Sequence, residues 1–135
     1  MLKPDYAETH NNLGNTLQIL GRIEGAEVSL GNAIVLNPDY AEAHSNLGNN
    51  LQIQGRLQDA EASYRKAIAL NPELAEAHSN LSSILLEKHQ ITAAMDAVII
   101  SIKIKSTDKA RSLFIEIANL TIPKVWDLSL SSRGD

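Results

Sequence analysis

The sequence contains no cysteine, few aromatic residues and no long apolar run. The lack of cysteine excludes disulfides, thiolate metal ligands and a thiol nucleophile. No apolar stretch approaches the roughly 20 residues that a membrane-spanning helix needs, so we expect no membrane partner. The N-terminal stretch MLKPDYAETH has no apolar signal core, and we therefore expect a cytoplasmic protein.

A predominance of one charge sign is also missing. The 12 basic and 16 acidic residues give a net charge of −4, and they are interspersed along the chain. Nucleic-acid binding requires a basic face, so we expect none. The chain has no glycine-rich phosphate loop, no nucleophile elbow and no acidic pair isolated in an apolar segment. We therefore predict that it is not an enzyme and holds no cofactor.

A repeat of 34 residues dominates what is present. Apolar residues make up 44% of the sequence and aromatic residues only 4%, which indicates a helical core of leucine, isoleucine and alanine. The segments 7–40 and 41–74 are identical at 20 of 34 positions. A third copy, 75–108, matches the second over its first seven residues, AEAHSNL, and then diverges.

Each unit is predicted to form two helices. Asp5 and Asp39 stand where a side chain can cap a first helix, and Glu8 and Glu42 lie three residues further on, as in a capping box. Glycines are expected to end the first helices and prolines the second helices. These residues are Gly21, Gly55, Pro38 and Pro72.

Small residues recur inside the predicted helices. Gly14 and Gly48 lie in mid-helix, where glycine costs about 1 kcal/mol relative to alanine. Such a cost is tolerable where a neighbouring helix approaches closely, so we expect close packing at both glycines. Alanines repeat at 34-residue spacing, at Ala26, Ala60 and Ala94 and at Ala33 and Ala67.

This pattern resembles the tetratricopeptide repeat (TPR) family over residues 2–108. The resemblance rests on the 34-residue period, Asn-Leu-Gly in the first helix, the alanine columns and Asn-Pro at the unit end. It implies an all-α, right-handed superhelical solenoid of antiparallel helix pairs, with about seven helices. The sequence departs from the family early in the first helix, where His10, His44 and His78 replace a large aromatic residue.

The repeat also predicts how the chain is divided. We expect the end of a preceding repeat at 1–6, repeats at 7–40, 41–74 and 75–108 (divergent), a capping helix at 109–120 and an extended tail at 121–135. The capping helix has an apolar face formed by Ala110, Leu113, Phe114 and Ile117. The tail is expected to be extended because Pro123 breaks a helix.

In the TPR family the first helices line the concave side, and the resemblance therefore implies a peptide-binding face there. Its residues are Asn11, Asn12, Asn15, Ser45, Asn46, Asn49, Ser79, Asn80 and Ser83. Carboxamides both donate and accept hydrogen bonds, so the column of Asn12, Asn46 and Asn80 is suited to holding a peptide backbone. This part of the sequence is similar to the repeat region of O-linked N-acetylglucosamine transferases, which implies an asparagine ladder that contacts substrate polypeptide. The alternative is that these amides bridge neighbouring helices or face water.

The histidines are not expected to bind metal. They occur once per unit, which separates neighbours by about 10 Å along a stack of helices, whereas zinc ligands lie about 2 Å from one ion. We predict that they pack or form hydrogen bonds between units. Glu27 and Glu61 are expected to be solvated on the second helices.

The tail carries the single tryptophan, Trp126. We consider that the tail covers an apolar end of the stack, lies in a groove, or is a disordered terminus. Its last three residues, Arg133–Asp135, spell the integrin-recognition tripeptide, which we discount because so short a motif recurs by chance.

The leading functional hypothesis is a scaffold module that binds a protein or peptide through the concave face. One alternative is a substrate-recruiting segment of a larger enzyme, such as a glycosyltransferase. The other is a self-assembly module that forms a homodimer through the array ends or the tail.

Overall fold

The chain is described by a computed structural model over residues 5–133, with side chains described over 5–121. These residues form seven helices and no strand, which confirms the all-α prediction. The helices are α1 (Tyr6–Ile19), α2 (Ile23–Leu36), α3 (Ala41–Ile53), α4 (Leu57–Leu70), α5 (Ala75–Glu87), α6 (Ile91–Ile104) and α7 (Asp108–Arg133).

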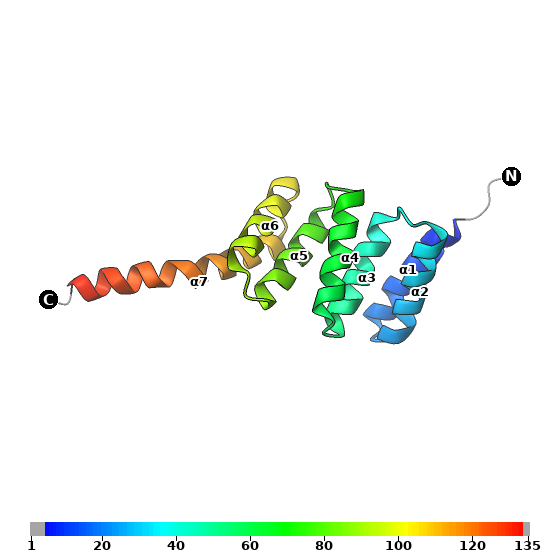
Figure 1. Ribbon diagram of the computed structural model, residues 1–135, viewed down its shortest axis with the longest axis horizontal. Helices are drawn as coiled ribbons and strands as arrows, with labels where there is room; N and C mark the ends of the chain where they lie inside the picture. The colour runs from blue at the N-terminus through cyan, green and yellow to red at the C-terminus, as the bar shows by residue number, and fades with distance from the viewer. Residues whose placement is uncertain (1–4, 134–135) are drawn as a thin grey trace.

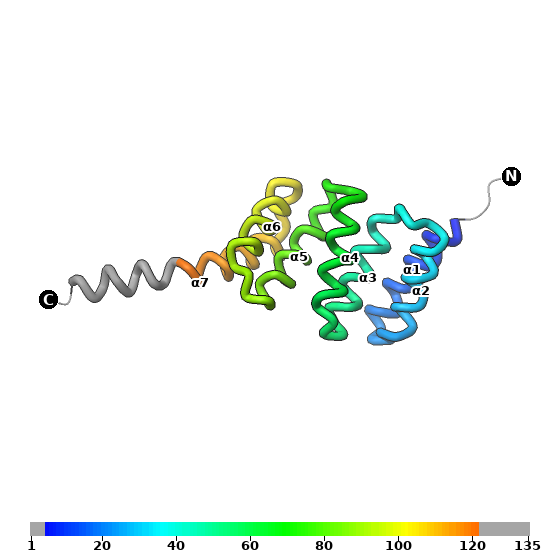
Figure 2. Tube along the Cα trace, viewed as in Figure 1, coloured from blue at the N-terminus to red at the C-terminus, as the bar shows by residue number. Residues whose placement is uncertain are grey.

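The helices form three antiparallel pairs that follow one another along the long axis of the molecule, with α7 after the third pair (Figure 1). The path of the chain, back and forth through successive pairs, is traced in Figure 2. Among the described residues, α1, α3, α5 and α7 each contact the next odd-numbered helix, whereas α2, α4 and α6 do not contact one another. The odd-numbered helices therefore form the inner side of a curved array.

Close packing at the mid-helix glycines is confirmed. A Cβ atom on Gly14 would lie 2.6 Å from Cγ of Leu30, and one on Gly48 would lie 2.7 Å from Cε1 of Tyr64. Leu30 and Tyr64 are fully buried. Each glycine therefore makes room for a large side chain from the second helix of its own pair.

The third pair solves the same packing problem differently. Ser82 stands 34 residues after Gly48, and Val98 stands 34 residues after Tyr64. The smaller valine leaves room for the serine side chain, whose hydroxyl donates a hydrogen bond of 2.6 Å to the carbonyl oxygen of Ala94. Both side chains are fully buried.

The turns within the pairs have a left-handed residue, as predicted at the two glycines. Gly21 has φ 79° and Gly55 has φ 77°. The third turn uses His89, with φ 60°. A side chain in this region of backbone space costs about 1–2 kcal/mol, so the third turn is the strained one.

The capping prediction is right for α1 and wrong for α3. The Asp5 carboxylate accepts a hydrogen bond of 3.2 Å from the amide of Glu8. At α3 the N-cap is Tyr40, and no side chain caps the helix. Asp39 instead lies in the preceding turn, where its amide donates to the side-chain oxygen of Asn37.

The last helix differs from the prediction for the tail. A helix was expected at 109–120 and an extended tail from 121, but α7 continues to Arg133. Pro123 removes one backbone donor, yet the residues around it are mostly good helix formers, and one missing hydrogen bond does not end the helix. The side chain of Trp126 and the residues Gly134 and Asp135 lie outside the described part of the chain.

The apolar face of α7 is confirmed at three of its four positions. Ala110, Leu113 and Ile117 are buried against the third pair, whereas Phe114 is 37% exposed. The three buried residues join a continuous hydrophobic cluster that extends from Leu51 on α3 to Ile117. That cluster positions the inner helices beside one another and includes no residue of α1 or α2.

Candidate functional site

The inner side of the array holds a polar hollow of about 330 Å³. Five of the nine predicted binding residues line it, together with Leu74 and two glutamates from α3 and α5. The five are Asn11, Asn12, Asn15, Ser45 and Asn46. The two glutamates are Glu42 and Glu76. Side chains from three successive inner helices therefore meet around one space.

Some of these amides connect neighbouring helices. The Asn46 amide donates a hydrogen bond of 2.9 Å to the side-chain oxygen of Asn11. Asn11 is 4% exposed and donates in turn to the Tyr40 hydroxyl at 3.4 Å. The expected bridging alternative therefore describes the pair Asn11–Asn46.

Other amides remain open to solvent. Asn12 and Asn15 are exposed, and within the described part of the chain their side chains form no hydrogen bond. Asn49 is half-buried. Each exposed carboxamide offers two N–H donors and one oxygen acceptor, which suits recognition of a peptide backbone.

A second hollow of about 270 Å³ continues the groove toward α7. Glu76 lines both hollows, and Ser79, Lys105, Thr107 and Lys109 line only the second.

Asn80, the last member of the predicted asparagine column, is 3% exposed. Its side-chain oxygen accepts a hydrogen bond from the Lys109 ammonium. Asn80 therefore ties α5 to α7, while Asn12 at the other end of the column is free to bind a ligand. The ninth predicted residue, Ser83, lies on α5 outside both hollows and accepts a 3.4 Å hydrogen bond from Gln52.

The histidines form hydrogen bonds at the junctions between units. Nε2 of His44 lies 2.9 Å from the carbonyl oxygen of Pro38, and Nε2 of His78 lies 2.9 Å from that of Pro72. Each ring thus donates to the loop that joins one pair to the next, as the hydrogen-bonding prediction states. No group of three or more potential metal-binding side chains was found in the part of the chain that the structure describes.

Glu27 and Glu61 were expected to be solvated, but they bridge adjacent pairs. Glu27 accepts hydrogen bonds from Gln54 at 3.0 Å and from Arg56 at 2.8 Å, and Glu61 accepts from Lys88 at 2.9 Å. The hydrogen bond from Gln54, followed by that from Arg56, lowers the pKa of Glu27. The hydrogen bond from Lys88 lowers the pKa of Glu61. These bridges fix the orientation of one pair relative to the next.

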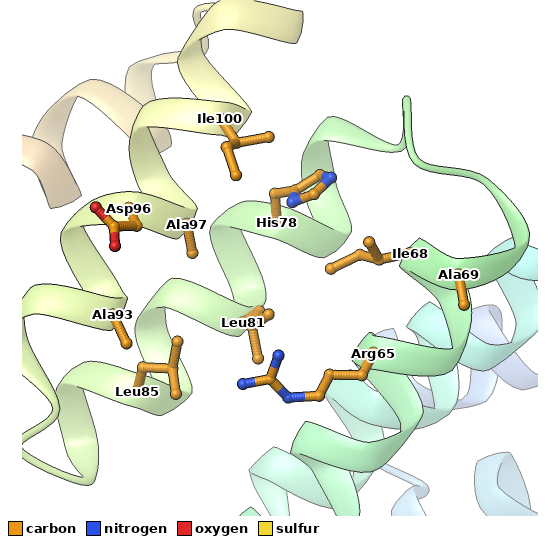
Figure 3. Close-up of a pocket in the computed structure, with 10 residues that line it drawn as sticks. All are labelled: Arg65, Ile68, Ala69, His78, Leu81, Leu85, Ala93, Asp96, Ala97 and Ile100. Carbon is orange, nitrogen blue, oxygen red and sulfur yellow. The ribbon is translucent and has the colours of Figure 1, made fainter.

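An apolar hollow of about 410 Å³ between α4, α5 and α6 was not predicted (Figure 3). Figure 3 shows Ile68 from α4, Leu81 and Leu85 from α5, and Ala97 and Ile100 from α6 around it.

The sequence carried a signal for this hollow. Ala93, Ala97 and Ile100 stand where the preceding unit has Asp59, Ser63 and Lys66. The third unit therefore exchanges polar side chains for apolar ones along one face of α6.

No described helix combines the length and the apolar character that crossing a membrane requires. The comparison with curated proteins gives no match. Family comparison matches residues 41–74 to the tetratricopeptide repeat and residues 14–55 to the TPR repeat.

Solved structures show the same fold at low sequence identity. The first TPR domain of Spaghetti (RPAP3), bound to the HSP90 peptide SRMEEVD, has a TM-score of 0.82 at 15% identity, covering 88% of this chain and 95% of that one. The Arabidopsis OM64 TPR domain has a TM-score of 0.81 at 16% identity, covering 84% and 94%. The Sgt2 TPR domain from Aspergillus fumigatus also has 0.81 at 16%, covering 87% and 79%. The chain thus belongs, through its repeats at 14–74 and the fold of its whole helical array, with the tetratricopeptide repeat proteins.

Proposed function

We propose that this chain binds an extended polypeptide in its inner groove and does not itself catalyse a reaction. The observation that carries the proposal is the meeting of amide and hydroxyl side chains from α1, α3 and α5 around one open hollow. Backbone peptide groups need donors and acceptors in the same place, and exposed carboxamides supply both. The peptide bound by the Spaghetti (RPAP3) domain shows that this fold can accommodate such a ligand, although 15% identity transfers no particular sequence.

The amides that are free to bind differ from those that hold the array together. Asn12 and Asn15 are exposed, whereas Asn11 and Asn80 are buried and bonded to neighbouring helices. A test on the whole asparagine column would confuse loss of binding with loss of structure. The informative variant therefore changes Asn12 and Asn15 only.

The test uses an array of twelve-residue peptides of varied composition, with affinities of the best binders measured by fluorescence anisotropy. Replacing Asn12 and Asn15 by alanine removes two amides that can each hydrogen-bond the ligand, at about 1 kcal/mol per bond. We expect about a tenfold or greater loss of affinity for the double variant. Asn32→Ala, at an exposed position on α2 outside both hollows, is the matched control. Unchanged affinity in the double variant would refute the groove as the binding site.

A second candidate is self-association through the ends of the array. An apolar hollow of about 410 Å³ lies on α6 and α7, with Ile99, Ile102 and Phe114 in its lining. At the opposite end, Leu13 of α1 is 47% exposed, whereas its counterpart Leu81 is 5% exposed. Exposed apolar surface of this kind favours association. Sedimentation at micromolar concentration that shows only monomer would refute it.

A role in recruiting substrate to a larger enzyme would use the same groove. The column of Asn12, Asn46 and Asn80 supports a relation to the repeats of O-linked N-acetylglucosamine transferases. We place this as a refinement of peptide binding, because the chemistry at the groove is identical in both cases.

A further inference from the structure

The charge along the inner groove changes sign between its first and second hollows. Glu42 and Glu76 are the second residues of α3 and α5, and Lys109 is the second residue of α7. The two glutamates line the first hollow, whereas Lys109 and Lys105 line the second. The same position on successive inner helices therefore runs from negative to positive.

Helix stability explains the glutamates but not Lys109. The N-terminus of a helix carries a partial positive charge, which favours acidic side chains in the first turn and disfavours basic ones. Lys105 is the C-cap of α6, where a cation is favoured. Lys109 stands in the first turn of α7 and meets the opposite field. Its position therefore invites a role beyond holding the helix.

These four charges are available to a ligand. Glu42, Glu76, Lys105 and Lys109 are exposed. In the part of the chain whose side chains are described, none of them takes part in an ion pair. Lys109 donates to the neutral oxygen of Asn80, which orients the ammonium and leaves its charge uncompensated.

We propose that the groove selects its peptide by charge order, with a basic side chain over Glu42 and Glu76 and a carboxylate over Lys105 and Lys109. This inference rests on the proposed peptide-binding function. Neighbouring helices are about 10 Å apart, and an extended chain advances about 3.3 Å per residue. The two ligand charges are therefore separated by three or four residues.

Two peptide families test this charge order. Both contain one lysine and one glutamate four positions apart in an otherwise uncharged sequence chosen from the groove-binding peptides, and they differ only in which charge comes first. A third peptide has glutamine at both positions. We expect one order to bind about fivefold more tightly than the other order and than the glutamine peptide, from two exposed ion pairs of modest strength. Raising the salt concentration should reduce this preference.

Variants then assign each ligand charge to its partner. Glu76→Gln and Lys109→Gln should each weaken the favoured peptide about threefold and leave the glutamine peptide unchanged. Lys109→Arg keeps the charge and should retain the preference. Glu24→Gln on α2 and Lys66→Gln on α4 change exposed charges outside both hollows and should have no effect.

Failure of this inference is distinguishable from failure of the proposed function. If the peptides bind and depend on Asn12 and Asn15, but both charge orders bind equally, the charge order is wrong and peptide binding stands. The same conclusion follows if Glu76→Gln and Lys109→Gln leave the preference intact. If none of the peptides binds, both proposals fall. Thermal unfolding of each variant checks that the fold is retained.

Discussion

Gly48 and Tyr64 share one small space between α3 and α4. The tyrosine ring lies where a side chain on residue 48 would be, and its hydroxyl donates a 3.0 Å hydrogen bond to Gln52. Burial raises the pKa of Tyr64, which keeps the ring neutral inside the pair. The geometry of the second unit therefore depends on the absence of a single methyl group.

Replacing Gly48 by alanine should destabilise the chain. The new Cβ would lie 2.7 Å from Cε1 of Tyr64, and overpacking of this kind costs about 2 kcal/mol. Gly31→Ala is the control, because a Cβ on Gly31 of α2 meets no atom within 4 Å. There the better helix propensity of alanine should stabilise by up to about 1 kcal/mol. Urea unfolding measures both, and equal changes in the two variants would contradict this account.

Sequence reasoning at the residue scale succeeded where packing follows the repeat. The mid-helix glycines and the buried alanines followed from 34-residue spacing alone. It failed for Glu27 and Asn80, since their partners Arg56 and Lys109 come from the next unit. Spacing tells which face of a helix a residue occupies, but not which long side chain reaches across to it.

At the scale of single helices, α1 and α3 begin differently despite their similar sequences. Asp5 caps α1, but Asp39 lies one residue before the N-cap of α3 and is used in the turn. The matching prediction for both helices failed because a one-residue shift in where a helix begins removes a capping interaction.

Alanine at these two positions should therefore have unequal effects. Loss of a capping aspartate costs about 1 kcal/mol, so Asp5→Ala should increase amide hydrogen exchange in the first turn of α1, at Glu8 above all. Asp39→Ala should leave the first turn of α3 unchanged. Comparable effects at both helix starts would show that Asp39 caps α3 after all. The exchange is best read by NMR, residue by residue.

The length of α7 was the largest error at this scale. Pro123 was given the weight of a helix terminator, yet α7 continues to Arg133. A proline ends a helix only when the residues beyond it also lack a reason to be helical. The expectation for 121–135 weighed one residue and neglected the propensity of its neighbours.

At the scale of the whole molecule, the core is uneven along the array. The continuous hydrophobic cluster includes residues from α3 to α7 and none from α1 or α2. On the inner helix of the first pair, Leu13, Ile19 and Leu20 are 47%, 78% and 66% exposed. In a repeat array each unit is stabilised by its own packing and by its neighbours, so the first pair has the weaker support.

We therefore expect the array to open from its first pair. Native-state hydrogen exchange should be faster by an order of magnitude or more in α1 and α2 than in α4 and α5, since local opening is easiest where apolar contacts are fewest. Limited proteolysis should cut the first pair before the others. Uniform protection along the chain would mean that the units unfold together.

The odd-numbered helices contact their successors, whereas the even-numbered ones do not. The inner edge therefore acts as a line of hinges, and the outer edge is joined between pairs mainly by the Glu27–Arg56 and Glu61–Lys88 bridges. Exposed ion pairs of this kind are weak and are screened by salt. A small rotation at each hinge adds to the next, so the curvature of the array responds to ionic strength, and the groove changes its width as a leaf spring changes its bend.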